Sequence, residues 1–273
     1  MSADKKAVRE QVWQAMTDAK VVGFPGAKGR IPNFTGAADA ARALADLDEW
    51  QAADTLKANP DMPQLPVRTR ALADGKLLYL AVPRLRDPSP FLLLDPDRLE
   101  VMPRAAASIK GSAVHGVPTA VPEIGHVDLI VCGTVAVNRD GVRIGKGGGY
   151  SDLEYALGCE AGIIDGDTVV VTTVHDVQVL ADDLPETDHD FRVDLVITPT
   201  EVIRTGAHRR PGRIHWSELT DDQIAAIPAL DALRPRRSAS ERSPPSTGAT
   251  SPWCVRAADP SRCCPRASPG GWR

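Results

Sequence analysis

Hydrophobic residues recur at helical spacing in two segments near the start of the chain. From Lys5 to Ala19 they fall three or four positions apart, which predicts an amphipathic helix. A second helix is predicted from Ala37 to Leu47, with Thr35 as its candidate N-cap. A third is expected from Asp152 to Gly162, directly after a run of glycines.

Five further segments are short and almost continuously apolar, as strands that are buried on both faces usually are. They run from Lys76 to Val82, from Pro90 to Leu94, from Val127 to Val137, from Thr168 to Val174 and from Val193 to Thr198. Because these strands alternate with helices, we predict an α/β fold. Its sheet is expected to be mostly parallel, with helices covering both faces.

Charge divides the chain at about residue 234. Residues 1–233 carry 24 Lys and Arg against 34 Asp and Glu, whereas residues 234–273 carry eight Arg and two acids. An acidic body does not attract nucleic acid, so no nucleic-acid partner is expected. We predict one compact domain over residues 1–233 and a separate tail over residues 234–273.

The tail has the composition of a disordered segment. It holds seven Pro and seven Ser in forty positions, and no apolar periodicity survives in it. Such a segment cannot bury a face that would offset the entropy of ordering, so we predict disorder. Two explanations stay open: translation in a wrong frame, which the abrupt change to a Lys-free composition indicates, and a basic tail that binds a polyanion.

The sequence predicts neither secretion nor a membrane span. Its start is charged and lacks the apolar core of a signal peptide. The longest apolar run, Leu129 to Val137, is about half of the ~20 residues that a membrane helix needs. The five cysteines show no zinc-ligand spacing and form no disulfide framework. We therefore expect a soluble, cytoplasmic protein that does not bind membranes.

A glycine-rich segment from Asp140 to Asp152 carries the strongest chemical signal. Gly145 and Gly147 to Gly149 follow a predicted buried strand and lead into a predicted helix. Glycines let the backbone approach a ligand, and consecutive N–H groups beside a helix N-terminus attract anions. Arg143 and Lys146 add positive charge to the same loop. We predict that the loop binds phosphate; a flexible hairpin with two solvated bases is the alternative.

This loop matches neither of the common phosphate-binding motifs, because both G-x-x-x-x-G-K-[ST] and G-x-G-x-x-G are absent from it. Asp152 lies three residues past the last glycine, where the predicted helix begins. It is either a helix cap or a Mg²⁺ ligand that faces bound phosphates, and the sequence leaves both open.

The loop resembles the signature of the 5-formyltetrahydrofolate cyclo-ligase family, G-x-R-L-G-x-G-x-G-Y-Y-D, which stands here as GVRIGKGGGYSD over residues 141–152. Other pieces follow in family order. They are KKAVR with Lys5 and Arg9, VDLIVCGTVAVNRDG before the loop, HDVQVL with Gln178, and HDFRVDLVIT with Asp194. The resemblance spans about residues 5–205.

The chain is most similar to the branch of this family found in methenyltetrahydrofolate synthetase domain-containing proteins. That branch carries RIPNF, GKGEGYADLEYA and P-x-x-I-x-W. The corresponding stretches here are Arg30 to Phe34, GKGGGYSDLEYA over residues 145–156, and Pro211 to Trp216.

The resemblance implies a three-layer α/β fold of the NagB/RpiA/CoA-transferase type. It also implies an ATP- and Mg²⁺-dependent cyclisation of 5-formyltetrahydrofolate to 5,10-methenyltetrahydrofolate, with a reduced folate as the small-molecule substrate. In the family scheme the formyl oxygen takes the γ-phosphoryl group. The folate N10 then attacks the activated carbon, and phosphate leaves.

The same resemblance implies roles for individual residues. Lys146 and Arg143 are the expected catalytic cations. The expected nucleotide-binding residues are Lys5, Arg9, Arg143, Gly145, Lys146, Gly147, Gly148, Gly149 and Tyr150. Asp152 and Asp194 are the expected Mg²⁺ ligands, and Tyr150 is expected to flank the bound substrates.

Three positions depart from the family pattern. Gly148 stands where the loop often has Lys, and Ser151 replaces a second Tyr. Arg68 stands where a Glu that contacts the folate is expected, and Arg suits an anionic group instead. We expect Arg68 to contact the substrate. Two alternatives to the folate reaction stay open: a relative that binds ATP and acts on another anionic metabolite, and a nucleotide-binding module without activity.

Overall fold

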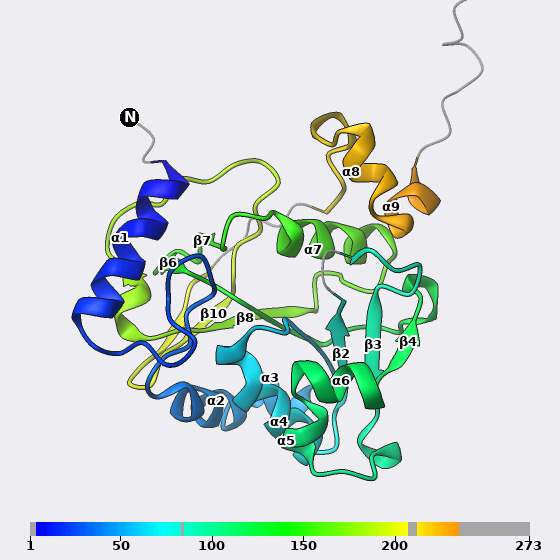
Figure 1. The fold of residues 1–273 in the computed structure, drawn as a ribbon, viewed down its shortest axis with the longest axis horizontal. Coiled ribbons are helices and arrows are strands. Elements are labelled where there is room, and N and C mark those ends of the chain that lie inside the picture. Colours follow the sequence, from blue (N-terminus) through cyan, green and yellow to red (C-terminus); the bar gives the residue numbers. More distant parts are fainter. Residues whose placement is uncertain (1–3, 83–84, 207–211, 235–273) are drawn as a thin grey trace, which may run out of the picture. The chain divides into compact units, whose positions relative to one another are not determined.

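An eight-stranded sheet runs through the described part of the chain, which comprises residues 4–82, 85–206 and 212–234 of this computed structural model (Figure 1). Its spatial order is β11-β10-β8-β5-β1-β2-β3-β4. The strands are β1 (Thr55–Ala58), β2 (Leu77–Ala81), β3 (Phe91–Leu94), β4 (Val117–Thr119), β5 (Leu129–Cys132), β8 (Val169–Thr173), β10 (Leu195–Ile197) and β11 (Val202–Arg204). The predicted tail falls outside the described residues beyond Arg234.

The five central strands, β10, β8, β5, β1 and β2, run parallel to one another. β3 and β4 extend one edge of the sheet in antiparallel fashion, and β11 does the same at the other edge. The prediction of a mostly parallel sheet is therefore confirmed. Parallel strands place their carboxyl ends at one edge of the sheet, where α/β proteins bind their ligands.

Helices cover both faces of the sheet (Figure 1). On one side lie α2 (Ala37–Ala45), α3 (Asp48–Ala52), α4 (Leu65–Ala73), α5 (Pro103–Ala106) and α6 (Ile109–His115). On the other side lie α7 (Tyr150–Glu160), α8 (Asp221–Ala225) and α9 (Pro228–Leu233). The helix α1 (Lys5–Asp18) packs against a smaller sheet. This is the predicted three-layer α/β arrangement.

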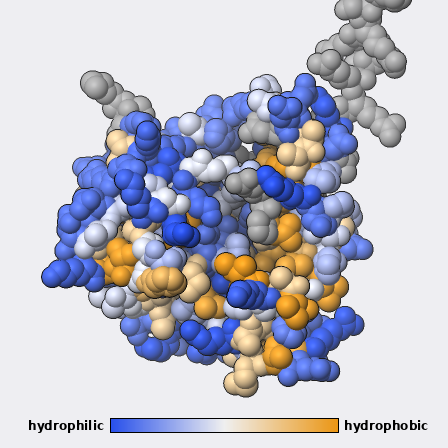
Figure 2. Space-filling view, viewed as in Figure 1, coloured by the Kyte–Doolittle hydropathy of each residue, from blue (hydrophilic) through white to orange (hydrophobic). Residues whose placement is uncertain are grey.

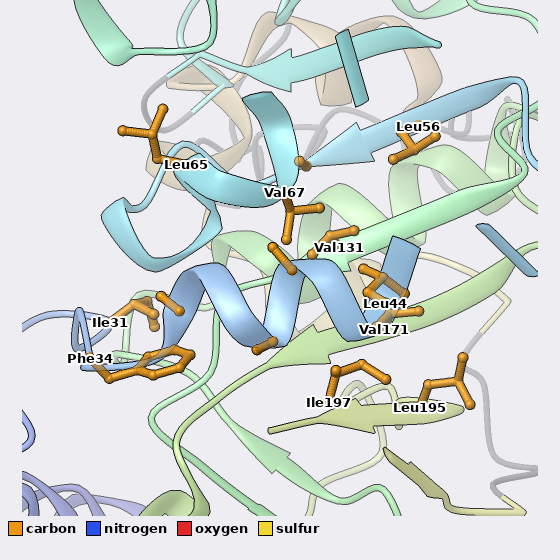
Figure 3. Packing of buried hydrophobic residues seen from close by; sticks show 14 of the residues in the cluster. Ile31, Phe34, Leu44, Leu56, Leu65, Val67, Val131, Val171, Leu195 and Ile197 are labelled. Carbon is orange, nitrogen blue, oxygen red and sulfur yellow. The ribbon is translucent and has the colours of Figure 1, made fainter. Parts of the chain in front are cut away.

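Two hydrophobic clusters join these layers, one on each face of the sheet. In the first, Leu44 of α2 packs with Val131 of β5, Val171 of β8 and Ile197 of β10 (Figure 3). All four are completely buried. Burying one such side chain stabilises the fold by roughly 1.5–3 kcal/mol.

The smaller sheet corrects one prediction. The segment from Val127 to Val137, expected as a single strand, divides into β5 and β6 (Ala136–Asn138). β6 pairs with β7 (Arg143–Ile144) and with β9 (Val179–Leu180). The division falls beside Gly133, where a Cβ atom would lie 3.0 Å from both Asp61 Oδ2 and Ile31 Cγ1. The chain leaves the main sheet at this close approach.

Two helix starts also differ from the predictions. The N-cap of α2 is Gly36 (φ +90°), not Thr35, and a Cβ atom there would lie 2.6 Å from Pro199 Cγ. The crowding and the positive φ together require glycine. The helix α7 begins at Tyr150, two residues before the predicted start at Asp152.

Hydrophilic residues cover most of the face seen in Figure 2, and hydrophobic ones appear there in separate patches. Within the described ranges, no helix combines the length and the apolar character needed to cross a membrane.

A buried ion pair fixes α7 on the sheet. Lys57 of β1 donates a hydrogen bond to Glu154 of α7, and both side chains are almost fully buried. The strand β1 was not predicted from the sequence, and Lys57 in its centre is one reason. Glu154 lies in the second turn of α7, so this pair also fixes the start of the helix and the glycine loop before it.

We expect Glu154→Ala to lower the free energy of unfolding by about 3–5 kcal/mol, because it leaves the Lys57 ammonium buried and unpaired. The double variant Lys57→Met/Glu154→Leu removes both charges, and its loss should be about 2 kcal/mol or less. Urea unfolding measures both changes. Equal losses of unfolding free energy in the two variants would contradict the conclusion that Lys57 and Glu154 form a buried ion pair.

Candidate active site

The glycine loop, residues 145–149, connects β7 to α7. Gly147 (φ +106°) and Gly149 (φ +68°) have backbone angles that favour glycine. Gly149 is the N-cap of α7, and none of the described side chains caps this helix. The N–H groups of the first turn therefore face outward with the positive end of the helix dipole, an arrangement that binds anions.

Arg143 braces the loop from its first side. Its guanidinium is buried, lies 3.9 Å from the ring centre of Phe191 and donates to Asp152 Oδ1 at 2.6 Å. Burial is the largest single influence and disfavours the charged form, but Asp152, Cys132 and Asp190 together outweigh it, and the pKa of Arg143 lies above its ordinary value. Asp152 is thus neither a helix cap nor an unpaired carboxylate, because it holds Arg143.

Arg9 of α1 braces the loop from another side. Its Nε donates to the carbonyl oxygen of Gly145 at 2.6 Å. A Cβ atom on Gly147 would lie 3.4 Å from the Arg9 guanidinium carbon, so the cation lies directly on the loop backbone. Arg9 and Arg143 are therefore both brought to the loop, as the sequence predicts.

Lys146 points to a carboxylate that the sequence analysis missed. Its Nζ lies 3.1 Å from Oδ1 of Asp61, and the lysine side chain is half exposed. Asp61 follows β1, at the carboxyl end of the parallel strands, and its other oxygen faces Gly133 after β5. An acid just after a strand is a signal for a site, but it was hidden because β1 itself was not predicted.

Lys5 is the first residue of α1 and is bound to the segment before β10. It donates to Asp190 and lies 3.4 Å from Thr187 Oγ1. Burial raises the pKa of the Asp190 carboxyl, but the hydrogen bonds from Lys5 and Thr187 outweigh burial, so the pKa lies below its ordinary value. This contact joins the first helix to a distant part of the chain.

A carboxyl whose pKa is lowered by folding stabilises the protein at pH values above its unfolded pKa, about 3.9 for Asp. The contribution is lost as the pH falls through the lowered pKa. We expect Asp190→Asn to lower the free energy of unfolding by about 1 kcal/mol at pH 7. Below pH 4 the free energy of unfolding should fall less steeply with pH in the variant than in the wild type. Urea unfolding from pH 2.5 to 7 tests this. The control Asp97→Asn changes an exposed Asp, and an equal effect there would contradict the assignment.

Arg68 lies inside the protein. The side chain is completely buried and donates to three carbonyl oxygens, those of Asn59 (2.7 Å), Asp61 (2.8 Å) and Ala107 (3.0 Å). Burial lowers the pKa of its guanidinium to about 10, which the Asp61 carboxylate opposes in part. Arg68 thus holds the loop that carries Asp61, and it lines neither of the two cavities described below.

Replacing Arg68 therefore tests whether it supports the fold or binds a substrate. We expect Arg68→Met to cost about 3 kcal/mol or more of unfolding free energy, because three buried carbonyl groups lose their donor. Arg70→Met, on the same helix but half exposed and paired only with Asp74, should cost less than about 1 kcal/mol. An unchanged urea midpoint for Arg68→Met would contradict the supporting role.

The two expected Mg²⁺ ligands have different partners. Asp152 binds Arg143, whereas Asp194 lies just before β10 and accepts the N–H of Val170 at 2.7 Å. Among the residues described, no group of three or more His, Cys, Asp or Glu side chains is placed to hold a metal. Mg²⁺ that is bound through nucleotide phosphates needs only one or two carboxylates, and Asp61 and Asp152 both lie beside the loop.

A cavity of about 430 Å³ opens next to the glycine loop. One part of its lining comes from Gly148, Gly149 and the first turns of α7, and another part, here called the wall, comes from eight residues between Arg213 and Ile227. The lining residues are Arg86, Gly148, Gly149, Tyr150, Asp152, Leu153, Ala156, His189, Arg213, Ile214, His215, Glu218, Leu219, Asp222, Ala226 and Ile227. The volume is in the range of small-molecule sites. Tyr150, a predicted site residue, is part of the lining.

A second, enclosed cavity of about 20 Å³ lies beneath α7, around the Lys57–Glu154 pair. It has room for little more than a water molecule. The larger cavity is therefore the candidate binding site.

The model of the 5-formyltetrahydrofolate cyclo-ligase family matches residues 1–199. The chain belongs to this family. It is 41% identical over 244 residues to the methenyltetrahydrofolate synthase domain-containing protein of Mus musculus and 38% identical over 248 residues to that of Homo sapiens. The alignments cover 85% and 86% of this chain and 63% of each relative, so the chain spans less than two thirds of their length.

The chain is also similar to the solved structure of 5,10-methenyltetrahydrofolate synthetase from Aquifex aeolicus. The TM-score is 0.49 at 19% identity, over 79% of this chain and 99% of the other.

Proposed function

We propose that this protein catalyses the ATP- and Mg²⁺-dependent cyclisation of 5-formyltetrahydrofolate to 5,10-methenyltetrahydrofolate. One observation carries the proposal beyond family membership. The glycine loop and the N-terminus of α7 face a cavity, and Arg9, Arg143 and Lys146 surround that loop. Phosphoryl transfer requires such positively charged surroundings more than it requires a protein nucleophile.

In the proposed site the loop amides and the helix N-terminus hold the phosphates of ATP. Lys146 is the most exposed of these three cations, with a half-exposed side chain whose described carboxylate partner is Asp61. It turns toward the γ-phosphoryl group when ATP binds. Arg9 and Arg143 are fixed by their hydrogen bonds and keep the loop in place.

Asp61 and Asp152 are the carboxylates best placed to hold Mg²⁺ together with the phosphates. When bound, Mg²⁺ neutralises charge on the phosphate oxygens. Asp194, the other expected ligand, accepts the N–H of Val170 in the sheet through one of its oxygens.

The reaction then needs a formyl oxygen aligned with the γ-phosphorus, and the folate N10 near the formyl carbon. The oxygen attacks the γ-phosphorus and ADP leaves. N10 then attacks the activated carbon and loses its proton, and the C–O bond breaks as phosphate leaves. The chain contributes positioning through Tyr150, beside the loop, and charge stabilisation through Lys146.

The charge reversal expected at Arg68 no longer opposes a folate substrate. Arg68 is buried against carbonyl groups, while an acidic side chain, Asp61, lies at the loop on the same segment.

A second candidate is a relative that binds ATP but acts on another anionic metabolite. It is favoured by Gly148, which leaves the loop one cation short of the usual family pattern. The two candidates share the nucleotide site and differ in the second substrate.

The test mixes the full chain with Mg-ATP and 5-formyltetrahydrofolate and follows methenyltetrahydrofolate by its absorbance. Lys146→Ala should lower kcat by about a hundredfold, because one donor to the transferring group is lost. Its stability should change by less than about 1 kcal/mol, as for other exposed pairs. The control Lys110→Ala changes an exposed lysine on α6 and should leave kcat unaltered.

Full turnover in Lys146→Ala would contradict its role. A wild-type protein that binds ATP but forms no methenyltetrahydrofolate would favour the second candidate.

A further inference from the structure

The wall of the large cavity that faces α7 comes from a part of the chain beyond the family match. The family model ends at residue 199, whereas the cavity is closed by residues between Arg213 and Ile227. Without this segment, the glycine loop and α7 would form an open surface. The segment therefore adds a binding element to the residues that match the family.

Its position relative to the loop indicates which part of a ligand it meets. Phosphates bound at the N-terminus of α7 would lie against Gly148 and Gly149, and both of these glycines also line the cavity. The ribose and base of a nucleotide are joined to these phosphates, so they would extend from the loop into this space. Apart from Arg86 and His189, all the other described lining residues outside the loop and α7 belong to residues 213–227, so the nucleoside would meet mainly this segment.

The chemistry of the lining suits a nucleoside. Apolar side chains of two elements line it, Leu153 and Ala156 from α7 and Ile214, Leu219 and Ile227 from the segment. A flat base buries apolar surface against such a lining. Exposed carboxylates at the rim can accept hydrogen bonds from the hydroxyl pair of a ribose, as acidic residues do in other nucleotide sites.

The charges of the lining disfavour the carboxylate-rich tail of a folate. The lining holds two arginines, Arg86 and Arg213, and two acids besides Asp152, namely Glu218 and Asp222. Asp152 is paired with Arg143, and Glu218 is hydrogen-bonded to the ring of His189. A balanced rim gives no net attraction to an anion, whereas a nucleoside carries no charge.

From these observations we infer that residues 213–227 form a nucleoside-binding wall that gives this protein its selectivity for the base of its nucleotide. The inference rests on the proposed nucleotide site, but not on the identity of the second substrate.

The test fills the cavity from this wall. Ala226 is exposed and lines the cavity, whereas its neighbour Ala225 is exposed but does not line it. We expect Ala226→Trp in the full chain to weaken ATP binding at least about tenfold by calorimetry in the presence of Mg²⁺. Inorganic tripolyphosphate, which lacks a nucleoside, should lose less than about twofold. Ala225→Trp should change neither affinity, and urea unfolding checks that both variants fold.

A second variant tests the wall without filling the cavity. Leu219→Ala shortens the apolar wall and should also weaken ATP binding while sparing tripolyphosphate. Unchanged ATP affinity in both wall variants, or an equal loss for ATP and tripolyphosphate, would overturn the inference. So would a raised KM for 5-formyltetrahydrofolate with ATP binding intact, because the cavity would then hold the folate.

These results separate the inference from the proposed reaction. If the wall variants weaken ATP binding as expected but no methenyltetrahydrofolate forms, the nucleoside-binding wall is supported and the proposed reaction is contradicted. If the protein forms methenyltetrahydrofolate and the wall variants have no effect on ATP binding, the reaction is supported and the wall is contradicted.

Discussion

The site is organised around the buried contact between Arg143 and Asp152. A guanidinium that is removed from water costs several kcal/mol unless a carboxylate and good packing compensate, and here Asp152 and the ring of Phe191 supply both. The two residues stand at opposite ends of the glycine loop, one on β7 and one in the first turn of α7. Their pairing therefore closes the loop and aims its N–H groups outward. The Lys57–Glu154 pair then fixes the same helix on the sheet.

Each charged lysine or arginine of the loop region has an acceptor within the protein. Arg143 has Asp152, Lys146 has Asp61, and Lys5 has Asp190. An entering anion must compete with these carboxylates. A weak monovalent anion gains too little from that exchange, whereas a chain of phosphates with a metal ion engages several cations at once and gives the displaced carboxylates a new partner. The charges that hold these elements together are thus the same ones that the proposed nucleotide phosphates would engage.

The sequence was sufficient for the architecture and for the loop, but not for the roles of single residues. Continuous apolar strands and helical periodicity are local signals, so β2, β8 and α1 were predicted nearly to their ends. The glycine spacing is local as well. Arg68, by contrast, is an arginine whose buried position depends on carbonyl groups from two other segments. The position of Asp61 depends on the pairing of β1 with β2 and β5. A four-residue strand that contains Lys57 has no local pattern from which this position could be predicted.

The contacts of α1 have a consequence for how the protein is made. Arg9 holds a loop that lies 136 positions later in the chain, and Lys5 holds a residue 185 positions away. Chain entropy must be given up before such distant contacts form, which makes them late events in folding. During synthesis the first helix therefore leaves the ribosome long before its partners exist. The glycine loop gains its contact with Arg9 only after residue 145 has emerged, and α1 gains its contact with Asp190 later still. A product that ends before residue 190 therefore lacks the second of these contacts.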